Sequence, residues 1–295
     1  MGGLTLESRK RLEDMAVRII TDSTADIPPH VAAEFGIRIV PLYVHFGHQV
    51  YRDGVDLTPE VFYRKLVANK KLPTTSTVAP EEFAQVYDEL SKETDEILAV
   101  TISSKLSATY DVALQGRDLR KDKKCRVEVM DSKLFCMALG LVVIGAAKRA
   151  REGANLDDVA EFAKGLYSRI HVRMAFDTLE YVRKGGRIGA AEAFMGRMLD
   201  VKPILTLKDG MATPVVRRRT RAKAIEYLRR FAASFDSIAE LAVAHTTTPE
   251  DAVGLVNDLD DVFPKERVYL SVIGPVVGTH LGPGALGIAV VEPER

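Results

Sequence analysis

The sequence predicts an α/β protein of two domains, with a mostly parallel sheet in the first domain. Short apolar runs rich in β-branched residues alternate with stretches of helical periodicity, which is typical of strands joined by crossover helices. Several of these runs end in polar residues, as expected where the carboxyl ends of parallel strands face a ligand. The chain has 295 residues, 46% of them apolar, and this suffices for two domains with substantial cores.

The first half contains most of the expected parallel strands. Its predicted strands share apolar, β-branched side chains and cover residues 17–23, 36–46, 48–54, 96–103 and 125–132. The second of them is expected to bend at Pro41, and the third is a short antiparallel excursion that ends in a turn at Asp53–Gly54. Thr58 before Pro59 predicts the start of a helix, because a hydroxyl caps the first turn and proline suits its first position.

A buried helix follows these strands and leads into the second half. Phe135 to Ala147 is the longest apolar run, Gly153 predicts the end of its helix, and Asn155 predicts the cap of the next one. Further strands are predicted at residues 172–178, 201–207, 238–245 and 267–274. We expect about four strands in each half. The predicted division is an N-terminal leader at residues 1–16, an N-terminal domain at residues 17–170 and a C-terminal domain at residues 171–295.

Charge and cysteine content argue against several classes of function. Lys plus Arg and Asp plus Glu both number 41, so the net charge is zero and no general attraction to nucleic acid is expected. The two cysteines, Cys125 and Cys136, match neither a zinc spacing nor a disulfide framework, which favours a reducing cytoplasm. The longest apolar run is shorter than the roughly 20 residues that span a bilayer, so no stable membrane insertion is expected.

Two segments bring hydroxyl side chains close together. Residues 74–77 are Thr-Thr-Ser-Thr, and residues 102–110 lead from a strand into a helix with Ser104 or Ser107 near its start. The free N–H groups and dipole of a helix start attract an anion, and hydroxyls donate further hydrogen bonds to a carboxylate. Ordinary helix capping is the alternative at both places, and Thr77 is predicted to cap the helix that follows it.

Two glycine-rich segments of the second half carry further candidate groups. Residues 177–189 predict a short helix broken at a glycine pair, beside Arg183 and Arg187. These arginines are either surface charges at a helix end or are directed across the cleft between domains at an anion. Residues 278–287 predict a loop in which the backbone approaches a ligand, and His280 in this loop is either structural or a ligand contact.

The sequence has no pattern that indicates covalent, nucleotide or metal chemistry. The motifs GxSxG, GxxxxGK[ST] and GxGxxG are absent, and the histidines are scattered. Asp22 and Asp26 could bind Mg²⁺, but two carboxylates in one loop more often form turns. We therefore expect no catalytic residue, no metal site and no cofactor.

Six segments, taken in order, resemble the DegV family of bacterial fatty-acid-binding proteins. They are ITDSTADIP, PTTST, ISSKLSATY, DTLEYVRKGGRIG, KPIL…DG and HLGPGALG, and they extend over residues 17–293. The resemblance implies a two-domain α/β protein that holds one long-chain fatty acid, with the carboxylate between the domains and the acyl chain in a tunnel. It also implies that the protein is not itself an enzyme. Some family members present the fatty acid to a separate fatty-acid kinase subunit and carry the acyl phosphate product.

The resemblance also implies a head-group site on this chain. The implied lipid-binding residues are Thr75, Ser76, Ser103, Ser104, Ser107, Arg183, Arg187 and His280. Thr75 and Ser107 are the main hydroxyl contacts, His280 lies at the head group, and one of the two arginines completes the anion site. The chain departs from the family at Ala108, where glycine is usual, and in the segment TSTVAP, which replaces a more usual Gln-Pro-Ser/Thr-Pro continuation. Neither departure removes a donor.

Two other functions stay open at this point. A phosphotransferase or hydrolase acting on its own would use Asp22, Ser107 and His280, and would turn over substrate without a partner. The basic run at residues 217–221 either begins an amphipathic helix with its arginines outward or docks an acidic protein.

Overall fold

Three sheets organise the computed structural model, which describes residues 17–69, 71–194 and 201–294. The leader predicted at residues 1–16 lies outside the described residues. The first sheet is parallel with the order β2-β1-β6-β7. Its strands are β1 (Val17–Asp22), β2 (Arg38–Val40), β6 (Glu96–Thr101) and β7 (Arg126–Asp131). This confirms the α/β class and the parallel sheet expected in the first half.

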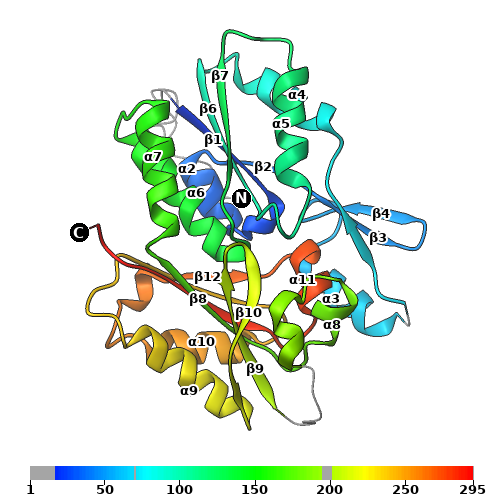
Figure 1. Ribbon diagram of the computed structural model, residues 1–295, viewed down its shortest axis with the longest axis vertical. Coiled ribbons are helices and arrows are strands. Elements are labelled where there is room, and N and C mark those ends of the chain that lie inside the picture. The colour runs from blue at the N-terminus through cyan, green and yellow to red at the C-terminus, as the bar shows by residue number, and fades with distance from the viewer. Residues whose placement is uncertain (1–16, 70, 195–200, 295) are drawn as a thin grey trace.

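A small antiparallel sheet projects beside the parallel one, with the order β4-β3-β5 (Figure 1). Its strands are β3 (Tyr43–Phe46), β4 (Gln49–Arg52) and β5 (Thr74–Ser76). The antiparallel excursion predicted after residue 47 is confirmed as β4. The single bent strand predicted at residues 36–46 is wrong, because Pro41 separates β2 and β3, which belong to different sheets.

The third sheet has six strands in the order β10-β9-β8-β13-β11-β12 and is mixed. Its strands are β8 (Ile170–Ala175), β9 (Lys202–Lys208), β10 (Met211–Arg218), β11 (Glu240–His245), β12 (Tyr269–Val272) and β13 (Leu286–Val291). The expected four strands were too few, because β10 and β13 were missed. β10 contains Pro214 and ends in arginines, and β13 begins inside the glycine-rich segment, at Leu286.

Helices cover both large sheets, and one helix lies between them (Figure 1). The α-helices are α2 (Pro29–Phe35), α3 (Pro59–Ala68), α4 (Pro80–Leu90), α5 (Thr109–Leu119), α6 (Cys136–Arg151), α7 (Leu156–Tyr167), α8 (Glu180–Lys184), α9 (Arg221–Ala232), α10 (Pro249–Asp258) and α11 (Pro275–Leu281). The 3₁₀ helices are η1 (Ser23–Ala25), η2 (Gly189–Phe194) and η3 (Lys265–Arg267). α6 packs against β1 and β6 of the parallel sheet and against β8, β11 and β13 of the mixed sheet. A helix enclosed on all sides must be apolar all round, which explains its long apolar run.

Local signals for helix ends were mostly correct. Thr58 caps α3 by accepting a hydrogen bond from the Val61 N–H, and Asn155 caps α7 by accepting one from the Asp158 N–H. The cap predicted at Thr77 is wrong: Ala79 is the N-cap of α4, and its N–H donates to Glu82 Oε1 at 3.0 Å. The buried Thr77 hydroxyl has no hydrogen-bond partner among the described residues.

The carboxyl ends of the parallel strands face the mixed sheet. Ser103, just after β6, donates a 2.8 Å hydrogen bond to the Gly210 carbonyl between β9 and β10. Such contacts place the loops that follow β1 and β6 against the second half of the chain. The domain limits at residues 17–170 and 171–295 stay a prediction, although the change of sheet does fall between β7 and β8.

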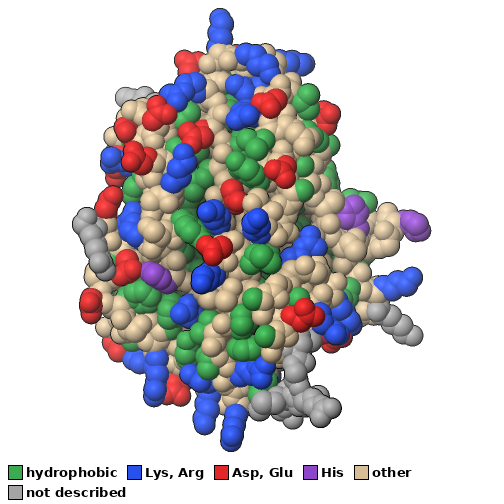
Figure 2. Space-filling view, in the orientation of Figure 1, with side chains coloured by type: hydrophobic (Ala, Val, Ile, Leu, Met, Phe, Trp, Pro, Cys, Tyr) green, Lys and Arg blue, Asp and Glu red, His purple; other side chains and the backbone are tan. Residues whose placement is uncertain are grey.

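Acidic and basic side chains are interspersed over the face of the molecule shown in Figure 2, as the zero net charge suggests. The basic run at the end of β10 has partners of its own. Arg217 stacks on Phe194, Arg218 stacks on Tyr227, and Arg221 pairs with Asp251. Among the described residues, no helix is both long and apolar enough to cross a membrane.

Candidate functional site

A cavity of about 330 Å³ lies where the carboxyl ends of the parallel strands meet the mixed sheet. Its walls come from the loops after β1 and β6, from β5 and α11, and from β8, β9 and β10. Most of the lining is apolar, including Ile102, Phe135, Val172, Met174, Leu205 and Leu207. This volume and an apolar wall with a few polar groups are typical of small-molecule sites.

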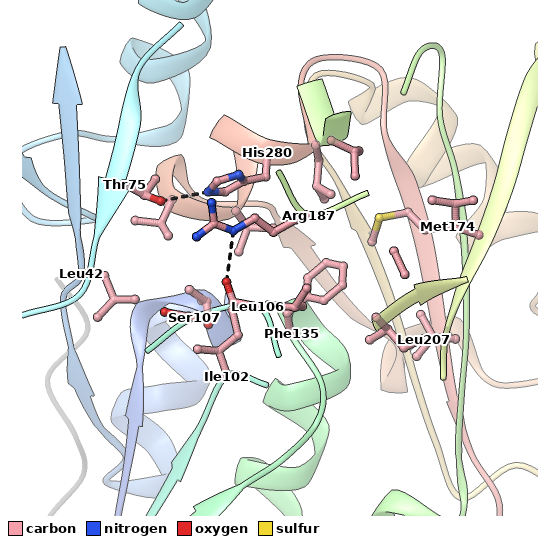
Figure 3. A pocket seen from close by; sticks show the side chains of 18 of the residues that line it. Leu42, Thr75, Ile102, Leu106, Ser107, Phe135, Met174, Arg187, Leu207 and His280 are labelled. Atoms are coloured by element: carbon pink, nitrogen blue, oxygen red, sulfur yellow. Dashed lines mark hydrogen bonds between the residues drawn. The ribbon is translucent and has the colours of Figure 1, made fainter. Parts of the chain in front are cut away.

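Four of the polar side chains that line the cavity gather at one end. Thr75, Ser107, Arg187 and His280 lie there, whereas Met174 and Leu207 lie at the opposite end (Figure 3). Thr75 Oγ1 and His280 Nε2 are 2.9 Å apart and share a hydrogen bond. The cavity therefore has an amphipathic layout, with hydrogen-bonding groups at its head and an apolar wall leading away from them.

Strand alternation decides which hydroxyls of residues 74–77 face the cavity. Thr75 in β5 points to His280. Ser76 touches the cavity wall, but its hydroxyl is 2.8 Å from His45 Nε2 on the exposed side of the small sheet. Thr74 is exposed, and Thr77 lines the cavity. Because neighbouring residues of a strand point to opposite faces, Thr75 faces inward, whereas Thr74 and Ser76 face the exposed side of the small sheet.

His280 lies in the last turn of α11, so the prediction that it sits in a loop is wrong. Burial first, and then the nearby Arg187 charge, lower the pKa of His280 to about 4. The ring is therefore neutral near pH 7. Its Nδ1 atom is buried and has no hydrogen-bond partner among the described residues. Gly185 leaves room for the ring, because a Cβ at that position would lie 2.3 Å from Nδ1.

Ser107 lies in the loop between β6 and α5 and lines the cavity. Its hydroxyl is 2.8 Å from Thr109 Oγ1 and accepts a 3.3 Å hydrogen bond from the Thr109 N–H. The structure does not bring the two neighbouring candidates to the cavity. Ser103 is buried and bonded to Gly210, and Ser104 donates to Asp131 Oδ2 at 2.6 Å.

Arg187 reaches across the head of the cavity from the glycine pair after α8. Its Nε donates to the Leu106 carbonyl at 3.1 Å and its Nη1 to the Gly185 carbonyl at 2.6 Å (Figure 3). The Arg187 guanidinium group lies beside the His280 ring in Figure 3. Arg183, on the preceding helix, is exposed and does not line the cavity. Of the two predicted arginines, the structure brings Arg187 to the site.

The chain matches the family described as "Uncharacterised protein, DegV family" over residues 16–293. The chain belongs to the DegV family. It is 36% identical over 284 residues to a DegV domain-containing protein of Caldanaerobacter subterraneus, with 94% of this chain and 99% of that protein covered. It is 32% identical over 278 residues to protein DegV of Bacillus subtilis, with 93% and 98% covered.

Two solved DegV structures have the same fold as this chain. The fatty-acid-binding DegV family protein of Thermus thermophilus superimposes with a TM-score of 0.87 at 33% identity, covering 95% of this chain and all of that one. DegV of Bacillus subtilis, a fatty acid binding protein, superimposes with a TM-score of 0.83 at 32% identity and with the same coverage. These likenesses confirm the family and the fold expected from the sequence.

Three buried carboxyl groups lie beside the DegV cavity without facing it. Asp22 accepts hydrogen bonds from the N–H groups of Thr24 and Ile102 at 3.0 and 2.8 Å. Asp26 accepts a 2.8 Å hydrogen bond from the Gly274 N–H, and Asp53 accepts bonds from Ser23 and from the N–H of Val276. Burial raises the pKa of all three, that of Asp53 to about 7.

These carboxyl groups hold the loop after β1 and the start of α11 in place, which is a positioning role. The Mg²⁺ site considered for Asp22 and Asp26 has no support, since no cluster of three metal-ligating side chains occurs within the described ranges. Thr24 and Thr77 also line the cavity but were not predicted as site residues. Each lies just after a strand, Thr24 after β1 and Thr77 after β5.

Proposed function

We propose that this chain binds one long-chain fatty acid in the cavity. The carboxylate lies at the end formed by Thr75, Ser107, Arg187 and His280, and the acyl chain lies along the apolar wall toward Met174. The observation that carries this proposal is the separation of polar and apolar groups to opposite ends of one cavity. The fatty acids bound by solved relatives support it.

The two ends of the cavity should contribute differently to the binding free energy. Burial of each methylene group contributes about 0.8 kcal/mol, so about 15 groups contribute on the order of 12 kcal/mol before the costs of ordering. A hydrogen bond to a charged group contributes roughly 1.5–3 kcal/mol. The acyl chain therefore supplies most of the affinity, and the polar end fixes where the carboxylate sits.

The chain is proposed to act as a carrier in the cytoplasm and not as an enzyme on its own. In this role it presents the carboxylate to a separate fatty-acid kinase subunit and retains the acyl phosphate. Arg187 is exposed beside the carboxylate end and offers a positive charge to a phosphate formed there. A fatty-acid kinase subunit is the partner that this role requires.

The alternative of independent phosphotransfer or hydrolysis has weaker support. Ser107 is bonded to Thr109 and His280 to Thr75, so these two candidates do not form a serine–histidine pair with each other. The Asp22 carboxylate already accepts hydrogen bonds from the N–H and hydroxyl of Thr24 and from the Ile102 N–H. A nucleophile needs an adjacent base, and this geometry does not provide one.

The decisive experiment is denaturing extraction of the purified protein followed by mass spectrometry of the released small molecules. About one fatty acid per chain, or uptake of added palmitate to that ratio, is expected. A protein that is empty and also takes up no palmitate would contradict the proposal. Loaded protein incubated with Mg²⁺ and ATP alone should form no acyl phosphate, and formation of it would favour the independent enzyme.

A further inference from the structure

Among the described residues that line the cavity, two have side chains that can carry a charge. They are Arg187 and His280, and both lie at the polar end (Figure 3). The other polar side chains of this lining are threonines and serines, whose hydroxyl groups stay neutral. A carboxylate that leaves water for this end therefore meets one permanent positive charge and one ring that can become positive.

The charge of Arg187 gives only part of the compensation that a carboxylate needs. The Nε and Nη1 atoms of Arg187 already donate to the carbonyls of Leu106 and Gly185. The residue is also exposed, so water screens its charge. Because burying a charged group is costly unless it is paired, a second positive charge at this end would favour the bound carboxylate.

The hydrogen bond between Thr75 and His280 shows what a proton on the ring would change. A neutral imidazole has one donor and one acceptor nitrogen, so Thr75 can use its only hydroxyl proton on Nε2. Both nitrogens of a protonated ring donate, so Nε2–H must donate to Thr75 Oγ1. The hydroxyl proton of Thr75 is then available to a carboxylate oxygen. One proton on His280 thus supplies both a positive charge and a hydroxyl donor.

The surroundings keep the ring neutral in the absence of a negative ligand. Burial and then the Arg187 charge lower the pKa of His280 to about 4, and Arg187 is the one charged group among the described residues that shifts it. Glu180 on α8, which packs against α11, is neutralised by an ion pair within its own helix. Asp26 and Asp53 bond to N–H groups at the opposite end of α11.

Two further titratable side chains on elements that contact α11 are bonded elsewhere. The Tyr63 hydroxyl on α3 donates to the Ile273 carbonyl at 2.9 Å. His45 on β3 shares a hydrogen bond with Ser76 on the exposed side of the small sheet. A carboxylate brought in by a ligand would therefore be the first negative charge to act on the His280 ring.

We propose that the fatty-acid carboxylate binds together with one proton, and that His280 holds this proton. The carboxylate is then matched by the charges of His280 and Arg187 and by the hydroxyl donor of Thr75. Palmitate affinity should rise as the pH falls from neutrality, because the bound form of the protein holds a proton that the free form lacks. The inference rests on the proposed function, since it needs a fatty acid in this cavity.

The first test compares palmitate with 1-hexadecanol, which has the same chain length and an uncharged head group, between pH 5.5 and pH 8. Palmitate affinity should rise by up to about tenfold for each pH unit lost, and 1-hexadecanol affinity should change less than about twofold. Calorimetry in two buffers of different ionisation enthalpy counts the protons. It should find roughly half a proton or more per palmitate at pH 5.5 and none per 1-hexadecanol.

Nuclear magnetic resonance of the wild-type complex locates the proton. At pH 5.5 the carboxyl carbon of ¹³C-labelled palmitate should give the signal of the ionised form, and both ring nitrogens of His280 should be protonated. His280→Gln can still bond to Thr75 but cannot gain a charge, so it should lose the proton uptake and the pH dependence of palmitate binding. His45→Gln is the matched control and should behave like the wild type.

Three results would overturn the inference while leaving the proposed function intact. They are palmitate binding without proton uptake, a pH dependence that persists in His280→Gln, and a neutral palmitate carboxyl group in the complex. The first and the third come from the wild-type protein, so they decide the matter even if His280→Gln does not fold. A wild-type protein that binds neither ligand would instead overturn the proposed function, and the inference with it.

Discussion

Thr75 and His280 are 205 residues apart in the chain and share a hydrogen bond of 2.9 Å. The bond joins β5 to the last turn of α11, so it forms only when the two halves of the chain are packed together. α11 also contacts α3, β3 and β5 from the first half and α8 from the second. The polar end of the cavity is thus a product of the packing between the halves.

The first prediction concerns the two main hydroxyls. The double variant Thr75→Val with Ser107→Ala should lower fatty-acid retention at least tenfold, because two donors to the carboxylate are lost. The free energy of unfolding should change by only about 1–3 kcal/mol, since few hydrogen bonds are removed. Extraction with mass spectrometry measures the bound lipid, and urea unfolding measures the stability.

The control for this prediction comes from the neighbouring hydroxyls. Ser76→Ala with Ser104→Ala removes two hydroxyls that are bonded to His45 and Asp131, away from the cavity. This control should retain lipid like the wild type. Equal retention by both double variants would show that the hydroxyls do not hold the carboxylate.

The sequence predicted which segments supply the hydroxyl groups of the site, but not which hydroxyl groups face the cavity. Residues 74–77 and 102–110 were identified by composition and resemblance, and both reach the cavity. Which hydroxyl faces inward depends on the pairing of β5 with β3, and a strand of three residues carries too short a pattern to reveal it. That pairing turns Thr75 toward His280 and the Ser76 hydroxyl toward His45.

The helix that carries His280 was missed for a different reason. The glycines at residues 278–287 suggested a loop, but Pro275 stands at the first helical position and Gly282 at the C-cap. Proline at the start and glycine at the end are the ordinary signals of a short helix. The parallel sheet was predicted correctly, because its central strands β1 and β6 are buried on both faces and give apolar runs that sequence alone reveals.

The second prediction concerns the space beside the His280 ring. Gly185→Ala would place a Cβ 2.3 Å from His280 Nδ1 and 3.1 Å from the Tyr181 carbonyl oxygen. Because the ring must move, the hydrogen bond to Thr75 should be lost, and lipid retention should fall with it. We expect a loss of about 1–3 kcal/mol in stability, as is usual for overpacking.

Gly165→Ala is the matched control for this substitution. Gly165 lies within α7, and no atom lies within 4 Å of its added Cβ. Alanine is the better helix former, so the free energy of unfolding of this variant should rise by about 0.5–1 kcal/mol. Its lipid content should not change. Thermal unfolding and lipid extraction report both effects. A Gly185→Ala protein with full lipid content would show that the position of His280 does not matter for binding.

The third prediction concerns the length of the acyl chain. A small second cavity of about 20 Å³ shares Phe135, Val172 and Met174 with the main one and is also lined by Gly287. Met174→Ala should open the apolar end and shift binding toward chains longer by about one or two carbons. Each added methylene is worth about 0.8 kcal/mol, or roughly fourfold in affinity.

Gly287→Ala should shift the preference in the opposite direction. A Cβ on Gly287 would lie 2.9 Å from Met174 Cε, so it would push the flexible methionine toward the main cavity. An equimolar mixture of saturated fatty acids of graded length, offered to each variant and then extracted, gives the preferred length. Identical length distributions in the two variants would place the end of the chain elsewhere.

The fourth prediction concerns the pH dependence of stability. Burial is the main cause that raises the pKa of Asp53 from 3.8 to about 7, and the charge of nearby Asp22 adds to it. Between these two pH values the folded chain binds a proton that the unfolded chain has released. The stability contributed by the protonated carboxyl is therefore lost as the pH rises through this window. Asp53→Asn cannot ionise, so its stability relative to the wild type should be greater at pH 8 than at pH 4.

Comparing the two proteins at each pH isolates this effect from that of His280. The lowered pKa of His280 gives the opposite slope, because between about 4 and 6.5 only the unfolded chain holds that proton. This contribution is present in both proteins and cancels in their difference. Urea unfolding of both at a series of pH values is the measurement. Parallel curves would mean that Asp53 titrates normally and that the carboxyl group next to Val276 at the start of α11 carries its charge at neutral pH.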